Sequence, residues 1–335
     1  MACSPLFYLR KIASKILHKV RQYSKPSPYD NMVKYDCKRW KNHIGCINPP
    51  SRNSLSYEIV MRAHGVEKGI TMPGFRLGFG TEKIPLITKA MNLYLEQGGN
   101  AESFEYLAGV RILKEYLDVH KKAEFELPET IITLINKAVC LSHEKASHQK
   151  LITREEFFSH KHSDFAQFSA SRHTIRNFAG QADRESIREA VALATNAPSA
   201  CNRQYIKAHL YEGNEITEQM RQLQGGTNGF GHLANQVILI TADMNALMWM
   251  HERHDLWNNA GLFLMNLCYA LHYKEIGCCI CAWSVSPEQD EAMHKLAGLP
   301  DSEIITTMLL IGKVPEQFYI ASSPRKELSQ VLIEH

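Results

Sequence analysis

Three basic side chains and a hydroxyl group stand within five positions of one another in the stretch Ser171–Phe178. The basic residues are Arg172, His173 and Arg176, and the hydroxyl belongs to Thr174. Alternate residues of an extended segment point the same way, so Arg172, Thr174 and Arg176 should share one face. Guanidinium groups suit phosphates and planar acceptors. The stretch predicts a site for a phosphate with a planar acceptor beyond it. The alternative is a solvated basic turn before a helix.

Two further stretches could contribute to the same site. Asn196–Gln204 reads Asn-Ala-Pro-Ser-Ala-Cys-Asn-Arg-Gln, and residues 324–326 read Pro-Arg-Lys. The first stretch is rich in amide and small side chains, although proline and asparagine also mark ordinary helix-ending loops. Cys201 has no activating partner that the sequence identifies, so we interpret it as a spectator thiol.

In this order and at these spacings, the three stretches resemble the FMN-dependent nitroreductase family, over roughly Ser163 to the C-terminus. The family pattern is R-[RH]-[ST]-x-[RK]-x-F, then P-S-x-x-N-x-Q, then a basic phosphate clamp. The resemblance implies an α+β fold with a central, mainly antiparallel sheet flanked by helices. It implies FMN as cofactor, NAD(P)H as electron donor, and reduction of a small organic acceptor by hydride transfer through flavin N5. The alternative function is a non-catalytic flavin-fold protein that binds a partner.

The resemblance also assigns roles to individual residues. Arg172, His173 and Thr174, together with Arg325 and Lys326, would bind the phosphate and ribityl oxygens through charge-assisted hydrogen bonds.

Arg176 matches the family's basic residue at the pyrimidine edge of the flavin. A cation there stabilises the reduced flavin and favours hydride acceptance, which makes Arg176 the candidate catalytic residue. The second stretch would contact the flavin ring from the partner subunit, so the resemblance implies a homodimer with two shared sites. Its matching residues are Pro198, Ser199, Ala200, Asn202 and Gln204.

Two segments depart from the family pattern. Asn228 stands where related proteins place a flavin-contacting asparagine, but the basic residue that often follows three positions later is Gly231 here. Cys278–Ser284 replaces a glycine-rich strand whose backbone N–H faces flavin N5. We expect Trp283 and Ser284 to provide that contact.

Nine cysteines, an odd number with no secretory signal ahead of them, favour reduced thiols in a cytoplasmic protein. Three of them stand close together in a predicted strand, where neighbouring residues point to opposite faces, so they cannot converge on one metal. These are Cys278, Cys279 and Cys281. The group around Cys37 and His43 lacks the spacing of a zinc site. The sequence therefore predicts no metal centre.

The first half of the chain carries no comparable motif. Apolar residues recur every three or four positions through 85–97, 101–121 and 128–144, which predicts helices. We expect a mostly helical domain at 30–150 and the FMN-binding domain at 160–335. The glycine-rich loop His64–Gly80, after a helix expected to end near Gly65 or Gly69, would either reach the flavin as a cover or pack on the second domain. This H-x-x-E-K-G half looks similar to proteins of bacterial cell-surface polysaccharide pathways, which suggests an acceptor of that kind.

Residues 1–29 form a separate basic segment, with six Lys or Arg residues and no acid. Apolar residues at helical spacing predict an amphipathic helix over Leu6–Val20, of a kind that can lie on an anionic membrane surface. We favour a helix docked on its own domain or a poorly ordered terminus, because no second membrane anchor is visible. No apolar run approaches the roughly 20 residues needed to span a bilayer. A net charge of +3 is too small to indicate nucleic-acid binding across the whole surface.

Overall fold

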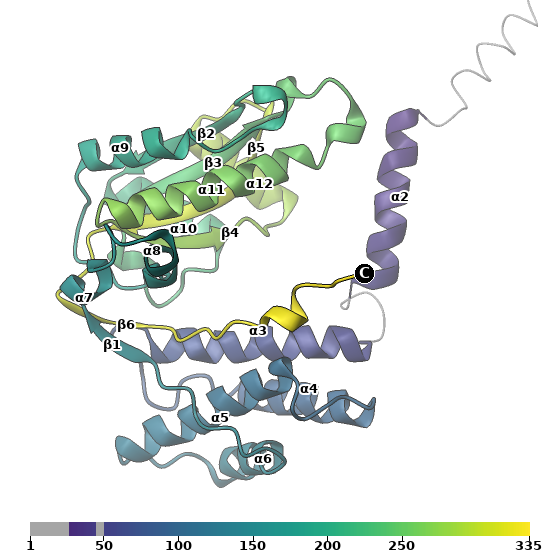
Figure 1. Cartoon of the computed structure of the whole chain (residues 1–335), viewed down its shortest axis with the longest axis vertical. Coiled ribbons are helices and arrows are strands. Elements are labelled where there is room, and N and C mark those ends of the chain that lie inside the picture. Colours follow the sequence, from purple (N-terminus) through teal and green to yellow (C-terminus); the bar gives the residue numbers. More distant parts are fainter. Residues whose placement is uncertain (1–26, 45–49) are drawn as a thin grey trace, which may run out of the picture.

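The computed structural model describes residues 27–44 and 50–335 (Figure 1). The amphipathic helix expected over Leu6–Val20 lies outside the described residues. The described chain forms a group of helices from the first half, a layered sheet from the second half, and a two-stranded ribbon between them. None of the described helices has the length and apolar character needed to cross a membrane.

The first half is helical, as its periodicity predicts. Its helices are α2 (Pro28–His43), α3 (Arg52–Ile70), α4 (Ile84–Glu96), α5 (Phe104–Lys122) and α6 (Glu129–Val139). The last four pack around one apolar core, to which each contributes a stripe of buried side chains at helical spacing. The largest fully buried side chains there include Tyr106, Tyr116, Leu55, Ile59, Met91 and Leu113.

Helix α3 continues through both glycines at which the sequence suggested an end. Ser51 caps its N-terminus, and Thr71 follows its last residue in a right-handed conformation, so no left-handed glycine closes it. Gly69 is instead needed for packing. A Cβ at that position would lie 2.0 Å from the Cε2 atom of Phe79, so the ring of Phe79 packs directly on the helix backbone. Gly65 has no atom within 4 Å of the corresponding position.

The second half contains the predicted antiparallel sheet. Its strands are β2 (Ile206–Glu212), β3 (Gln236–Asp243), β4 (Gly277–Ala282) and β5 (Glu303–Gly312). They lie in the order β2-β3-β5-β4, and each neighbouring pair is antiparallel. The two central strands are buried almost throughout, as expected for strands covered on both faces.

Two pairs of helices cover the two faces of this sheet. Helices α9 (Arg184–Ala194) and α11 (Asp255–Tyr273) share one core with the sheet, and α10 (Asn214–Gln224) and α12 (Pro287–Ala297) share the other. The cap predicted for α9 is present, since the side chain of Asp183 accepts a hydrogen bond from the backbone of the first turn.

The alternation along β3 assigns its side chains to these two cores. Ile238 and Ile240 contact the core with α9 and α11, and Val237 and Leu239 contact the core with α10 and α12. The central sheet is therefore a middle layer between helices, which matches the expected α+β architecture.

A short ribbon joins the two halves and was not predicted. Strand β1 (Lys150–Thr153) pairs antiparallel with β6 (Gln317–Ile320). Helices α7 (Arg154–Phe158) and α8 (Phe165–Ser171) then lead into the sheet region. After β6 the chain returns along α3 (Figure 1), so the basic residues that follow position 320 lie between the two halves.

Candidate functional site

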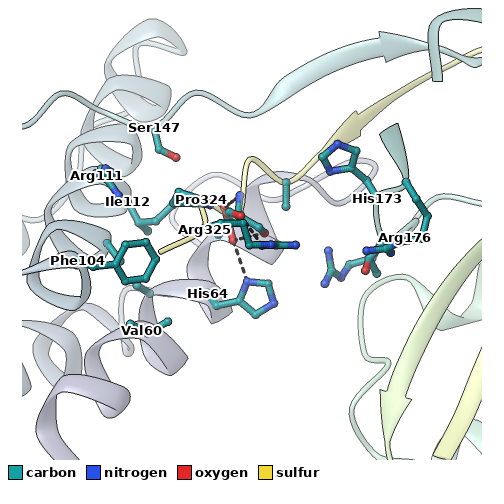
Figure 2. Close-up of a pocket in the computed structure, with 17 residues that line it drawn as sticks. Val60, His64, Phe104, Arg111, Ile112, Ser147, His173, Arg176, Pro324 and Arg325 are labelled. Atoms are coloured by element: carbon teal, nitrogen blue, oxygen red, sulfur yellow. Dashed lines mark hydrogen bonds and ion pairs between the residues drawn. The ribbon is translucent and has the colours of Figure 1, made fainter. Parts of the chain in front are cut away.

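A cavity of ≈ 330 Å³ lies between the helical half and the sheet half. Helices α3 and α5 form one wall, the segment that follows α8 forms another, and the chain after β6 forms a third (Figure 2). From the sheet half it receives Arg172, His173, Thr174 and Arg176, and from the C-terminal segment Arg325. Five residues predicted to bind the cofactor therefore line one cavity.

Backbone pairing orients the segment that carries four of these residues. The N–H of Ile175 donates to the carbonyl of Cys278 in β4, at 2.9 Å, and the Ile175 side chain is 1% exposed. The alternating side chains of Arg172, Thr174 and Arg176 line the cavity, as an extended segment with Ile175 buried beneath it requires.

The cavity is strongly cationic. Four arginines line it, and Glu67 is the single carboxylate among its described lining residues. The Nε atom of Arg172 and an Nη atom of Arg111 are buried without a hydrogen-bond partner in the described part of the chain. Buried charged donors without partners are costly. An anion is the partner that such donors require, and a flavin phosphate is one such anion.

The pKa values of two neighbouring groups reflect the same accumulation of positive charge. Burial, followed by the charges of Arg172 and Arg325, lowers the pKa of His173 below its usual value. Burial, followed by the charge of Arg176, lowers the pKa of Lys68 on α3. Both side chains lose positive charge more easily than in water, mainly because they are buried and secondly because cations lie near them. A dianionic phosphate would relieve this repulsion.

Sequence reasoning missed a bonded pair in the cavity wall, His64 and Glu67. Nδ1 of His64 lies 2.8 Å from Oε2 of Glu67, whose side chain is 5% exposed. Burial raises the pKa of Glu67, but the hydrogen bonds from His64 and from the backbone of Ser323 outweigh it, so the pKa lies below its usual value. The H-x-x-E spacing, which places both side chains on one helix face, was the available signal.

The loop hypothesis for His64–Gly80 is therefore partly corrected. His64 and Glu67 do line the same cavity as Arg176, but they stand on α3 and not on a loop. Beyond the helix, Met72 packs against the core of the sheet half. Its Sδ atom lies 2.8 Å from the place where a Cβ on Gly229 would stand. This part of the loop packs on the second domain, which was the other alternative.

The second motif lies elsewhere on the same chain. Pro198, Ser199 and Gln204 line a separate hollow of ≈ 100 Å³ beside α11, and Ala200 and Asn202 lie in the short 3₁₀ turn η1 (Ala200–Asn202). None of the five is among the described residues that line the larger cavity. The expected contribution of these residues to a partner's site stays a prediction.

The backbone of this motif is strained and firmly held. Cys201, Asn202 and Gln204 adopt left-handed φ angles of 51°, 54° and 50°, which non-glycine residues rarely do. Arg203 fixes the loop by donating to the carboxylate of Glu252, with two contacts of 3.1 Å. The hydrogen bonds from Arg203 lower the pKa of Glu252 to about 2. Strain of this kind gathers at functional sites, which keeps the loop a candidate.

Position 231, where related proteins often have a basic residue, has little room for a side chain. A Cβ on Gly231 would lie 2.7 Å from Oγ1 of Thr227 and 2.9 Å from Cδ of Arg221, so no longer side chain fits. Asn228 is exposed, and its side chain donates to the carbonyl of Gly225 at 3.4 Å. It does not line the cavity.

Three further residues that were expected to bind the cofactor do not line the cavity. They are Trp283, Ser284 and Lys326. The indole N–H of Trp283 donates to Asp290 at 2.6 Å, and neither Trp283 nor Ser284 is a cavity-lining residue. The ammonium group of Lys326 pairs with Glu105 of α5 at 2.5 Å. That pairing turns Lys326 toward the helical half, and Arg325 alone of the C-terminal pair lines the cavity.

The clustered cysteines are buried and divided between the two cores. Cys279 and Cys281 belong to the core with α10 and α12, and Cys278 belongs to the other. In the described part of the chain no three His, Cys, Asp or Glu residues could hold a metal ion. The described cysteines are all free thiols.

Comparison with known proteins places this domain in a family. Residues 170–313 match the family model described as "Nitroreductase family". The C-terminal half contains a nitroreductase-family domain. No curated protein matches the chain.

Solved structures match the same half. A nitroreductase family protein from Streptococcus pneumoniae is 20% identical, with a TM-score of 0.44, over 51% of this chain and 100% of its own. A protein assigned as an NADH oxidase from Clostridium acetobutylicum is 18% identical, with a TM-score of 0.44, over 50% and 99%. One assigned as an NAD(P)H:FMN oxidoreductase from Staphylococcus epidermidis is 15% identical, with a TM-score of 0.46, over 52% and 96%.

Proposed function

We propose that this protein is an FMN-dependent oxidoreductase that uses NAD(P)H to reduce a small organic acceptor. The observation that carries the proposal is the cationic cavity between the helical half and the nitroreductase-family domain, where Arg172, Thr174, Arg176 and Arg325 converge. The buried, unpartnered Nε of Arg172 supports an anionic ligand at that place. When bound, FMN would supply two-electron transfer between a nicotinamide and the acceptor.

The residues of the chain divide into two roles in this proposal. Arg172 and Arg325, with Thr174, bind the phosphate by charge-assisted hydrogen bonds. Arg176 holds a positive charge beside the ring edge that becomes more negative on reduction, which favours electron uptake. The half-buried Lys68, whose charge interacts with that of Arg176, adds to the positive potential at that end. Protons would come from water.

The proposal includes a homodimer. The strained loop Pro198–Gln204 lies outside the cavity of its own chain, so a second copy would supply it to the flavin ring. Helix α11 lines the same hollow as this loop through Asn259 and Phe263. Its exposed apolar side chains Trp257 and Leu262 would support such an interface.

An absorption spectrum tests the function directly. Purified protein is incubated with excess FMN, desalted, and then treated anaerobically with NADH or NADPH. We expect a retained yellow flavin that is bleached by one of the two nucleotides. Retained flavin that neither nucleotide bleaches would point to another electron donor. Failure to retain FMN by a folded protein would favour the alternative, a non-catalytic binding protein built on the flavin fold.

A further inference from the structure

A buried carboxylate of the helical half holds the segment that carries Arg325. Glu67 is 4% exposed. Its Oε1 accepts hydrogen bonds from the backbone N–H of Ser323 at 2.8 Å and from the hydroxyl of Ser322 at 3.3 Å. Its Oε2 accepts from the hydroxyl of Ser323 at 3.1 Å. A single side chain of α3 thus fixes two consecutive residues that lie more than 250 positions away in the sequence.

A further hydrogen bond links Ser323 to the guanidinium group of Arg325. Ser323 has a left-handed φ of 37°, a conformation that needs support from its surroundings. An Nη atom of Arg325 donates to the carbonyl of Ser323 at 2.5 Å. Glu67 therefore stabilises the backbone conformation on which the orientation of Arg325 depends.

His64 is held by the same carboxylate and lines the same cavity (Figure 2). The ionised Glu67 carboxylate accepts a hydrogen bond from Nδ1–H of His64. Nε2 is therefore the ring atom left for a ligand. In its protonated form the ring donates from both nitrogens, one toward Glu67 and one into the cavity. Its side chain is 41% exposed, so a ligand in the cavity can reach it.

We propose that the helical half completes the phosphate site of the cofactor, with His64 as a phosphate-binding residue and Glu67 as the positioning residue for Arg325. The inference rests on the proposed FMN function and adds residues from outside the nitroreductase-family domain. It also gives the helical half a role, because α3 accepts three of the hydrogen bonds that hold the C-terminal segment.

Fluorescence titrations with FMN and with riboflavin, which lacks the phosphate, test this proposal. Glu67→Gln and His64→Ala should each weaken FMN binding by about tenfold, since each loses a hydrogen bond that involves a charged group. Riboflavin binding should stay unchanged in both. Glu58→Gln is the matched control, because Glu58 pairs with Arg62 on the same helix, away from the cavity, and it should leave both affinities unchanged.

Several results would overturn the proposal. Equal losses of FMN and riboflavin affinity would mean a merely structural role, and unchanged FMN affinity would exclude any role. A wild-type protein that binds both ligands equally would refute the phosphate site alone, and one that binds neither would refute the proposed function as well. If Glu67→Gln does not fold, His64→Ala and Ser323→Ala decide the question. Ser323→Ala removes one of the hydrogen bonds to Glu67 and should weaken FMN binding alone.

Discussion

The ring of His272 in α11 meets the hydroxyl of Ser171, the residue before Arg172, with 2.9 Å between Nε2 and Oγ. His272 is 2% exposed and packs against three phenylalanine rings, and its Nδ1 has no partner in the described part of the chain. Burial, then the charges of Arg172 and His173, lowers its pKa to about 4. The start of the basic segment therefore rests on a histidine that stays neutral.

This histidine should make the stability of the protein depend on pH. Its folded pKa lies below the unfolded value of about 6.5, so the unfolded state binds a proton first as the pH falls. Its contribution is fully present above pH 6.5 and is lost progressively toward pH 4, by about 3 kcal/mol at most. Urea unfolding at several pH values should show this loss in the wild type. His272→Phe should reduce it, whereas His143→Gln, at an exposed position, should not.

Two glycines of α3 should respond in opposite ways to alanine. Gly65→Ala should stabilise the protein by up to about 1 kcal/mol, because alanine favours the helix and nothing lies within 4 Å of the new Cβ. Gly69→Ala should destabilise it by about 1–3 kcal/mol, since the Cβ would overlap the ring of Phe79. Urea denaturation of both variants checks the pair. Stabilisation by both would show that Phe79 moves aside without cost.

The layered sheet could be predicted because its signals are local. Buried strands such as β3 read as continuous apolar runs, and caps such as Asp183 mark helix starts in the sequence. The ribbon of β1 and β6 could not be predicted, because each strand has only four residues and its pairing partner lies far away in the chain.

In the cavity, too, some features could be predicted from the sequence and others could not. The segment Arg172–Arg176 could be recognised, since its spacing alone places three side chains on one face. The contribution of Glu67 could not, because its partners at 322 and 323 come near it only through the return of the chain along α3. The orientation of Lys326 was missed for the same reason, since Glu105 that pairs with it belongs to the other half.

Two arginines of the cavity should affect bound flavin in different ways. Arg176→Gln should retain FMN but shift its two-electron reduction potential to more negative values, by about 30 mV if the lost interaction favours reduced flavin by about 1.4 kcal/mol. Arg325→Gln should weaken FMN binding and leave the potential of the bound flavin unchanged. Dye-equilibration titrations of both holoproteins measure the potentials. Equal shifts in the two variants would contradict the assignment of Arg176 to the ring edge.

The proposed sharing of sites between subunits can be tested by complementation. One variant carries Arg172→Glu, which places a carboxylate in the phosphate site. The other carries Asn202→Gly and Gln204→Gly, which remove both amides while glycine accepts the left-handed φ of these positions. Each homodimer should bind FMN poorly.

In a heterodimer of the two variants, the shared arrangement predicts one site with both defects and one site with none. Purification through two different affinity tags should therefore give a dimer that binds one FMN with wild-type affinity, while each parent homodimer does not. If each subunit builds its site alone, every site in the heterodimer keeps one defect and no wild-type site appears. A wild-type protein that is monomeric by light scattering would exclude the shared arrangement altogether.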